Sequence, residues 1–121
     1  MESEDFGFKK LIVWQKALDF ADKVIDLAEH LNTSGKHFRL IEQIEASSAS
    51  IVQNIAEGKG RNSKKEFVHY LYISRGSLYE TVTILNLFYK RSWIEIEKLK
   101  KMEKEALEIA KMIKGLINSL Y

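Results

Sequence analysis

The segment best suited to chemistry runs from Glu57 to Lys65 and reads Glu-Gly-Lys-Gly-Arg-Asn-Ser-Lys-Lys, with two glycines and four cations around a predicted helix start. The first N–H groups of a helix have no partner inside it, and the helix dipole makes that end positive. Lys59, Arg61, Lys64 and Lys65 can therefore hold a phosphate. The segment is not a Walker loop, which follows a strand and needs Gly-Lys-Ser/Thr four residues after its first glycine. A solvated turn remains the alternative.

A run of small residues, Ala46-Ser47-Ser48-Ala49-Ser50, offers hydroxyl groups but predicts no catalytic site. A serine nucleophile needs a base beside it, and no histidine of this chain stands in a supporting pattern. Small side chains instead allow a neighbouring backbone to come close, and each hydroxyl can bond back into its own helix. We therefore predict close helix packing at this run.

Glu66-Phe67-Val68-His69 matches the Glu-x-x-His element of di-iron bundles. Such a site needs a second copy of the element and further glutamates, all facing inward. Here there is one copy, and the apolar residues of this segment take the core direction, which turns Glu66 and His69 away. We therefore predict no metal site.

Glu57 and Glu80 can be considered as paired carboxylates for acid-base work, but no nucleophile or cofactor loop accompanies them. We interpret them as structural polar residues that form salt bridges, with Arg61 or Arg75 as partners. Asn54 is interpreted in the same way, as a structural polar residue. We therefore expect no catalytic activity and no cofactor.

The composition indicates one globular domain over residues 1–121. The chain has 19 basic and 17 acidic residues, but residues 59–91 hold seven basic and two acidic ones, so the positive charge is concentrated there. The absence of cysteine suits a reducing cytoplasm. The acidic start predicts no signal peptide, and no apolar run approaches the roughly 20 residues that a membrane span needs. We expect a cytoplasmic protein that does not enter a membrane.

Apolar residues at three- and four-residue spacing predict four helices, over residues 9–31, 37–57, 64–91 and 93–119. Two capping boxes, Ser63 to Glu66 and Ser92 to Glu95, indicate the starts of the third and fourth helices, and Gly58 indicates the end of the second. The chain has no proline to interrupt them. Short joints between long helices predict an all-α, antiparallel, up-down-up-down four-helix bundle.

Some apolar residues lie off the predicted core stripes, and they suggest a surface where copies of the chain associate. The candidates for this oligomer interface are Ile41, Val52, Val68, Tyr72 and Tyr79. The alternative is that these residues simply widen the core.

The motifs Asn54-Ile-Ala-Glu-Gly58 and Gly76-Ser-Leu-Tyr-Glu80, with Val13-Trp-Gln-Lys-Ala17, resemble a known family. The chain is similar to the four-helix bundle proteins encoded in intervening sequences of bacterial 23S ribosomal RNA genes. A distant relative in architecture is the accessory protein of diversity-generating retroelements. The resemblance implies a bundle that assembles into a ring-shaped homopentamer. This chain departs from the family at Glu45-Ala46, where basic residues are common.

Our leading hypothesis is a non-catalytic oligomeric module that binds RNA or DNA phosphates through the basic segment. Repetition around a ring would multiply weak contacts. The rival hypothesis is a protein-protein adaptor, in which the ring scaffolds a partner enzyme and the basic segment aids solubility. An enzyme is the third and least supported class.

Overall fold

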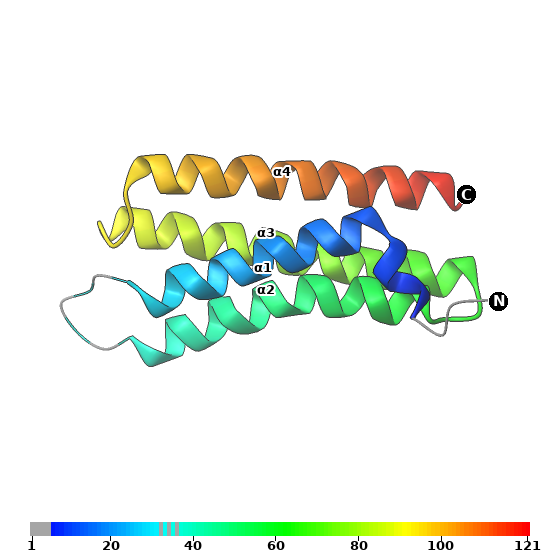
Figure 1. The fold of residues 1–121 in the computed structure, drawn as a ribbon, viewed down its shortest axis with the longest axis horizontal. Helices are drawn as coiled ribbons and strands as arrows, with labels where there is room; N and C mark the ends of the chain where they lie inside the picture. The colour runs from blue at the N-terminus through cyan, green and yellow to red at the C-terminus, as the bar shows by residue number, and fades with distance from the viewer. Residues whose placement is uncertain (1–5, 32, 34, 36) are drawn as a thin grey trace.

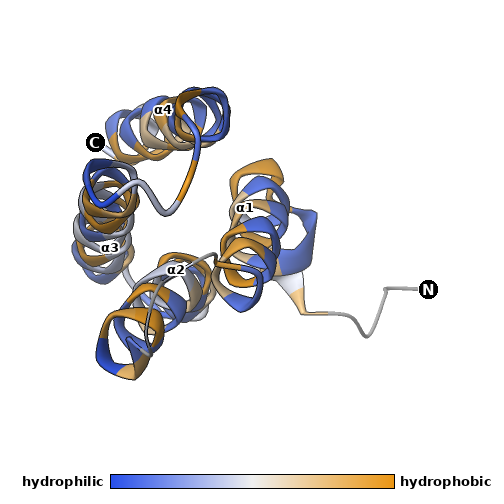
Figure 2. Ribbon diagram, turned by 90° about the vertical axis from the view of Figure 1, so that its left-hand side faces the viewer, coloured by the Kyte–Doolittle hydropathy of each residue, from blue (hydrophilic) through white to orange (hydrophobic). Residues whose placement is uncertain are grey.

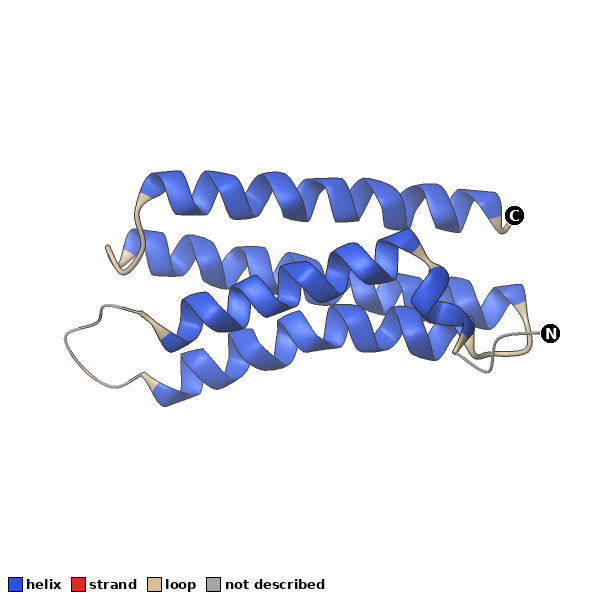
Figure 3. Cartoon of the chain, in the orientation of Figure 1, coloured by secondary structure: helices blue, strands red, loops and turns tan. Residues whose placement is uncertain are grey.

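The computed structural model describes residues 6–31, 33, 35 and 37–121. After a short 3-10 helix, η1, the chain forms four long helices: η1 (Gly7–Lys10), α1 (Ile12–Glu29), α2 (Phe38–Lys59), α3 (Lys64–Lys90) and α4 (Ile96–Ser119). Neighbouring helices alternate in direction (Figure 1), and the described part of the chain consists of helices and loops without strands (Figure 3). The predicted all-α, up-down four-helix bundle is confirmed.

The four helices surround one core in chain order, so that α4 also packs against α1 (Figure 2). The α2–α3 contact is the most extensive, and the α1–α4 contact is the least extensive among the long helices. The α1–α2 pair and the α3–α4 pair form opposite sides of the bundle. One end, the η1 end, carries η1, the α2–α3 turn and the C-terminus; the other end carries the α1–α2 and α3–α4 connections.

The core is an apolar stripe on each helix, as the spacing predicts. Full burial of one Leu, Ile or Phe side chain stabilises the fold by roughly 1.5 to 3 kcal/mol relative to exposure, so the stripes dominate stability. The largest fully buried apolar side chains come from all four helices: Phe20, Val24, Ile44, Ile51, Ile55, Leu71, Leu78, Leu85, Phe88, Ile109 and Ile113.

The α2–α3 contact contains a row of buried or half-buried hydroxyl groups. Ser47 and Thr81 share a hydrogen bond of 2.8 Å between their side-chain oxygens. One turn further along α2, Ser50 and Ser77 share another of 2.8 Å. The buried Ser74 hydroxyl donates to the carbonyl oxygen of Ile51 at 2.7 Å. The close packing predicted for the serine-rich run is therefore observed, and small polar side chains let the two helices approach.

Gly58 lies at a tight contact between α2 and α3, and its predicted role as a helix stop is wrong. α2 continues through Gly58 to Lys59, and Gly58 is buried. A Cβ atom at Gly58 would lie 2.8 Å from the Cβ of Tyr70 and 2.9 Å from Cδ1 of Phe67. Glycine is therefore required at this position for helix packing, not for chain reversal.

We expect Gly58→Ala to destabilise the protein. Overpacking of a tight core costs about 1 to 3 kcal/mol, which exceeds the gain of at most about 1 kcal/mol that alanine brings to a helix. Gly115→Ala is the matched control, because a Cβ there meets nothing within 4 Å. Urea unfolding should show a lower midpoint for Gly58→Ala and an equal or higher one for Gly115→Ala. Equal midpoints for the two variants would contradict the close contact.

The first predicted helix, 9–31, is divided at Leu11, whose backbone is extended at φ −72° and ψ 122°. The break turns η1 back so that it contacts both α1 and α2. The side-chain amide of Gln15 donates to the carbonyl of Lys9 at 2.7 Å, and the Phe8 ring lies 5.2 Å from that of Trp14. These contacts replace the helical hydrogen bonds that the break removes.

The predicted capping box at Ser92 is also wrong, because α4 begins at Ile96 and no side chain caps it. Ser92 instead follows the end of α3 with a left-handed backbone, φ 65°. Its N–H donates to the carbonyl of Tyr89, and the N–H of Trp93 donates to that of Phe88, both at 2.9 Å. The Phe88 and Trp93 rings are 5.5 Å apart. This is a Schellman motif with its apolar contact, so Ser92 ends a helix and does not start one.

We expect Ser92→Gly to stabilise the protein, because a left-handed backbone costs an L-residue roughly 1 to 2 kcal/mol and glycine nothing. The greater freedom of glycine in the unfolded chain offsets part of that gain. Thermal or urea unfolding would measure the change. Ser92→Ala is the control, since alanine keeps the strain and should give no gain; a gain of the same size in both variants would contradict this explanation.

Candidate nucleic-acid interface

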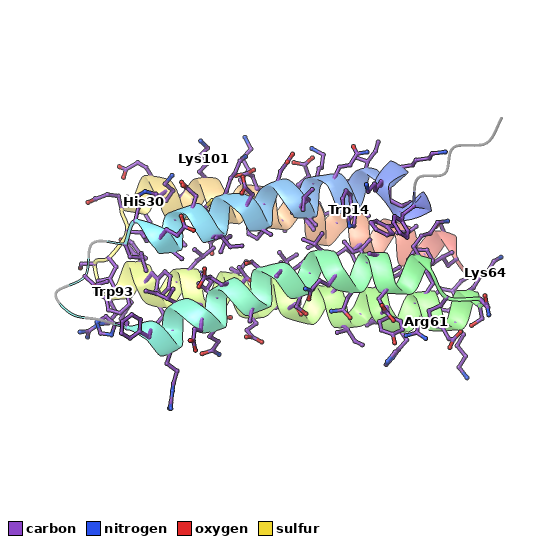
Figure 4. All side chains as sticks on the ribbon, turned by 60° about the horizontal axis from the view of Figure 1, so that its bottom comes forward. Trp14, His30, Arg61, Lys64, Trp93 and Lys101 are labelled. Carbon is purple, nitrogen blue, oxygen red and sulfur yellow. The ribbon has the colours of Figure 1, made fainter. Side chains whose placement is uncertain are left out.

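The four cations singled out in the sequence gather at the η1 end. Lys59 ends α2, Arg61 lies in the α2–α3 turn, and Lys64 and Lys65 form the first turn of α3. Figure 4 shows Arg61 and Lys64 at this same end of the bundle. All four side chains are exposed. They surround the N-terminus of α3, where helix geometry leaves backbone N–H groups without partners and the dipole is positive.

The start of α3 is fixed by the predicted cap at Ser63. Its hydroxyl oxygen accepts the backbone N–H of Glu66 at 3.1 Å, and its hydroxyl lies 3.3 Å from the Glu66 carboxylate. The Ser63 half of the predicted capping box is therefore confirmed, whereas the Glu66 carboxylate accepts from the Ser63 hydroxyl and not from the Ser63 backbone N–H. The Ser63 cap fixes the backbone of Lys64 and Lys65 in the first turn of α3, next to the α2–α3 turn.

Arg61 and Lys59 are positioned by side chains of their own chain. The Arg61 guanidinium pairs with the Glu57 carboxylate, donates to the Tyr70 hydroxyl at 2.6 Å and lies 4.8 Å from the centre of the Tyr70 ring. The Lys59 ammonium lies 6.0 Å from the centre of the Phe67 ring. Glu57 neutralises part of the Arg61 charge, so Lys64 and Lys65 are the stronger candidates for contact with an anion.

Lys9 and Lys10 in the last turn of η1 bring two further cations to this end. η1 contacts α2, and Phe8 lines a surface hollow together with Glu57, Gly60 and Arg61. The sequence interpretation missed this addition, because it continued the helix through residue 11. No proline or glycine indicates the break at that position, so the sequence offers little signal for it.

Three residues were predicted to be structural polar residues: Asn54, Glu57 and Glu80. Asn54 and Glu57 form hydrogen bonds or an ion pair with described residues, and Glu80 forms neither. The side-chain amide of Asn54 donates to the carbonyl and the hydroxyl of Ser50 at 2.8 and 2.9 Å, which ties it to the α2–α3 contact. Glu57 forms the expected ion pair with Arg61. For Glu80, no hydrogen bond or ion pair occurs with any described residue. Arg75, its other candidate partner, donates to the Tyr79 hydroxyl at 2.8 Å.

Some of the residues expected at an oligomer interface are buried within the protomer, and others are exposed. Val52 and Val68 are buried inside the protomer, 7% and 8% exposed, so their predicted position off the core is wrong. The prediction considered the apolar stripe of each helix by itself, whereas neighbouring helices cover these two side chains. Ile41 is partly buried against the core. Tyr72 and Tyr79 are 49% and 50% exposed, so these two remain on the surface of α3 as expected.

Two groups of side chains resemble metal ligands, and both are exposed. Glu66 and His69 face solvent, in the direction that the sequence predicted. Asp26, Glu29 and His30 at the end of α1 bring possible ligand atoms within 4.8 Å of one another. The backbone carbonyl of Asp26, 2.8 Å from Nδ1 of His30, raises the pKa of His30, and the Asp26 carboxylate adds to the effect. A raised pKa favours the charged form of His30, which suits the negative end of the helix dipole at the C-terminus of α1.

The fold and the site first define a class of protein: an all-helical up-down bundle with a basic end. The chain belongs to the 23S rRNA-intervening sequence protein family, whose model matches residues 9–115. It is also similar to a solved structure from Bacteroides thetaiotaomicron VPI-5482, a protein of unknown function from the S23 ribosomal protein family. The two share 29% sequence identity and a TM-score of 0.81, over 88% of this chain and 98% of that chain.

The family resemblance seen in the sequence motifs is thus confirmed. A comparison with curated proteins finds no match. None of the described helices combines the length and the apolar character that a membrane crossing requires.

Proposed function

We propose that the protein is a non-catalytic, self-associating binding module of the cytoplasm that contacts RNA or DNA phosphates through its η1 end. The observation that carries this proposal is the presence of six exposed cations at one end of the bundle, four of them at or near the N-terminus of α3: Lys9, Lys10, Lys59, Arg61, Lys64 and Lys65. Among the described side chains of η1, the α2–α3 turn and the helix turns beside it, Glu57 and Glu66 are acidic, so the cations outnumber the carboxylates there.

The chemistry of this end suits phosphate better than it suits a neutral ligand. Lysine ammonium groups and helix N–H groups are donors without acceptor capacity, and phosphate oxygens accept from both. Phosphate contacts of this kind give affinity and orientation but carry little sequence information. The names of the family and of its solved member refer to ribosomal RNA and to the ribosome. RNA is therefore the first nucleic acid to test.

We expect a structured RNA to bind the protein with an affinity that falls as salt rises. Changing Lys64 and Lys65 to alanine should weaken binding and reduce the slope of log affinity against log salt by about 1 to 2, the value for two lost phosphate contacts. Fluorescence anisotropy across a salt series measures both quantities. The double variant Lys98→Ala, Lys101→Ala is the matched control, because it removes the same charge at the opposite end of the bundle, where Figure 4 places Lys101.

Equal loss in the two double variants would mean that net charge alone governs binding. Negligible binding by the unchanged protein would remove the nucleic-acid proposal. In that case the exposed Tyr72 and Tyr79 favour the second candidate, an adaptor that binds a partner protein, because tyrosine is enriched at protein interfaces.

Self-association is the second part of the proposal, and the family resemblance makes a homopentamer the expected form. The exposed tyrosines of α3 supply apolar surface for it. Several copies in one particle would present several basic ends to one nucleic acid and so multiply weak contacts.

We expect light scattering to give a particle mass of roughly five times the 14.1 kDa of one chain. The mass should fall on dilution only below the dissociation constant of the assembly. A mass of one chain at every concentration tested would contradict self-association.

A further inference from the structure

Two apolar grooves lie on opposite sides of the bundle. The first lies between α3 and α4 and has a volume of about 620 Å³. Ala106 and Ala110 of α4 leave room for it, because their side chains are small. Tyr79 of α3 and Leu107 of α4 line it and are 50% and 56% exposed. An exposed tyrosine and leucine beside an apolar groove are typical of a surface that is covered in an assembly.

The second groove lies between α1 and α2 and has a volume of about 290 Å³. Leu18 and Ile25 of α1 and Ala49 and Val52 of α2 line it. Leu18 is 45% exposed. Figure 2 shows the α1–α2 side and the α3–α4 side facing away from each other across the core.

The charges beside the α3–α4 groove are mainly positive. Four lysines of α4 lie three, four or seven residues from Leu107, which places them on the same face of the helix. All four are exposed, and none forms an ion pair within the described part of the chain: Lys100, Lys104, Lys111 and Lys114. Glu103 is the carboxylate that lines this groove, and the side-chain amide of Asn86 donates to it at 2.8 Å.

The charges beside the α1–α2 groove are mainly negative, although Lys59 lies seven residues after Val52. Asp22 lines the groove itself. Glu45 and Glu42 lie four and seven residues before Ala49 on α2, and Glu29 lies four residues after Ile25 on α1, so helical spacing places them on the groove side. The two grooves therefore have opposite charge on their rims.

Two ion pairs between α1 and α4 of the same chain contribute to the difference in charge between the two grooves. Lys16 pairs with Glu108 at 2.9 Å, and Lys23 pairs with Glu105 at 2.6 Å, both between α1 and α4. The Glu105 hydrogen bond raises the pKa of Lys23, and the Lys16 hydrogen bond lowers the pKa of Glu108. These pairs engage two cations of α1 and two anions of α4, so the charges without an ion pair are acidic on α1 and mainly basic on α4.

We infer that the α3–α4 groove of one copy receives the α1–α2 side of a second copy, in a head-to-tail contact. This inference rests on the proposed self-association and says which surfaces produce it. Because the two surfaces differ, the contact is heterologous, and repetition leads to a closed ring or an open filament. Opposite charge at the rims steers the two copies together and excludes contacts between two like surfaces.

Charge reversal on each side tests the contact. The first variant carries Lys104→Glu and Lys111→Glu on α4, and the second carries Asp22→Lys and Glu42→Lys on α1 and α2. Each variant reverses two of the four charges on one rim and so brings like charges together at two positions of the contact. Each should therefore associate at least about 10-fold more weakly than the unchanged protein. An equimolar mixture should give a larger mass than either variant alone, because a contact between different variants again joins opposite charges. A ring of five cannot alternate two variants throughout, so the expected recovery is this gain in mass and not the full mass of the unchanged assembly. Sedimentation velocity measures the mass, and circular dichroism checks that each variant remains helical.

The control variant is Lys98→Glu, Lys101→Glu, which makes the same change of charge on a side of α4 away from Leu107 and should keep the mass of the unchanged protein. If the unchanged protein assembles and the two test variants also assemble, or lose mass without recovery on mixing, the proposed contact is wrong and self-association stands. If the unchanged protein is one chain throughout, both proposals fail. If the α4 variant loses RNA binding but keeps its mass, the basic side binds nucleic acid, and the contact is overturned.

Discussion

The close approach of α2 and α3 is the constraint on which the rest of the bundle depends. It requires a residue without a side chain at Gly58 and small hydroxyl-bearing residues along the middle of both helices. Hydroxyl pairs that bond across the contact satisfy each other, so the polar groups do not oppose burial. The same approach fixes the turn between the two helices, and with it the direction in which Lys64 and Lys65 leave the bundle. The position of the basic end therefore depends on how α2 and α3 pack around Gly58, several residues before Lys64.

Ion pairs between α1 and α4 affect the surface of the molecule more than its stability. The ion pairs between α1 and α4 are half-exposed, and such pairs contribute at most about 1 kcal/mol each. Their larger effect is on what remains unpaired, since they leave carboxylates along α1 and ammonium groups along α4. A chain with almost no net charge can therefore present two strongly different surfaces. Total charge is a poor guide to the partners of such a protein.

The sequence predicted the helices correctly because apolar spacing reports the core directly. The sequence-based prediction was wrong where one local pattern is compatible with two different structures. Ser92 fits an N-terminal cap, yet the neighbouring Phe88 and Trp93 stabilise a C-terminal motif there. Val52 and Val68 lie off the stripe of their own helix, but neighbouring helices cover them. The candidate phosphate site was found from charge and a capping box, whereas the addition of Lys9 and Lys10 depends on a break that has no sequence signal.

The unequal helix contacts also have a consequence for motion. α4 is held by its apolar stripe, by small residues facing α3 and by exposed ion pairs to α1, whereas α2 and α3 share the most extensive contact. Sub-global opening begins where contacts are fewest, so we expect α4 to detach first while α2 and α3 stay protected from hydrogen exchange. The segment that joins α3 to α4 is then a hinge. Through it, copies held close together can exchange their last helices, and the same bundle can form from two chains by domain swapping.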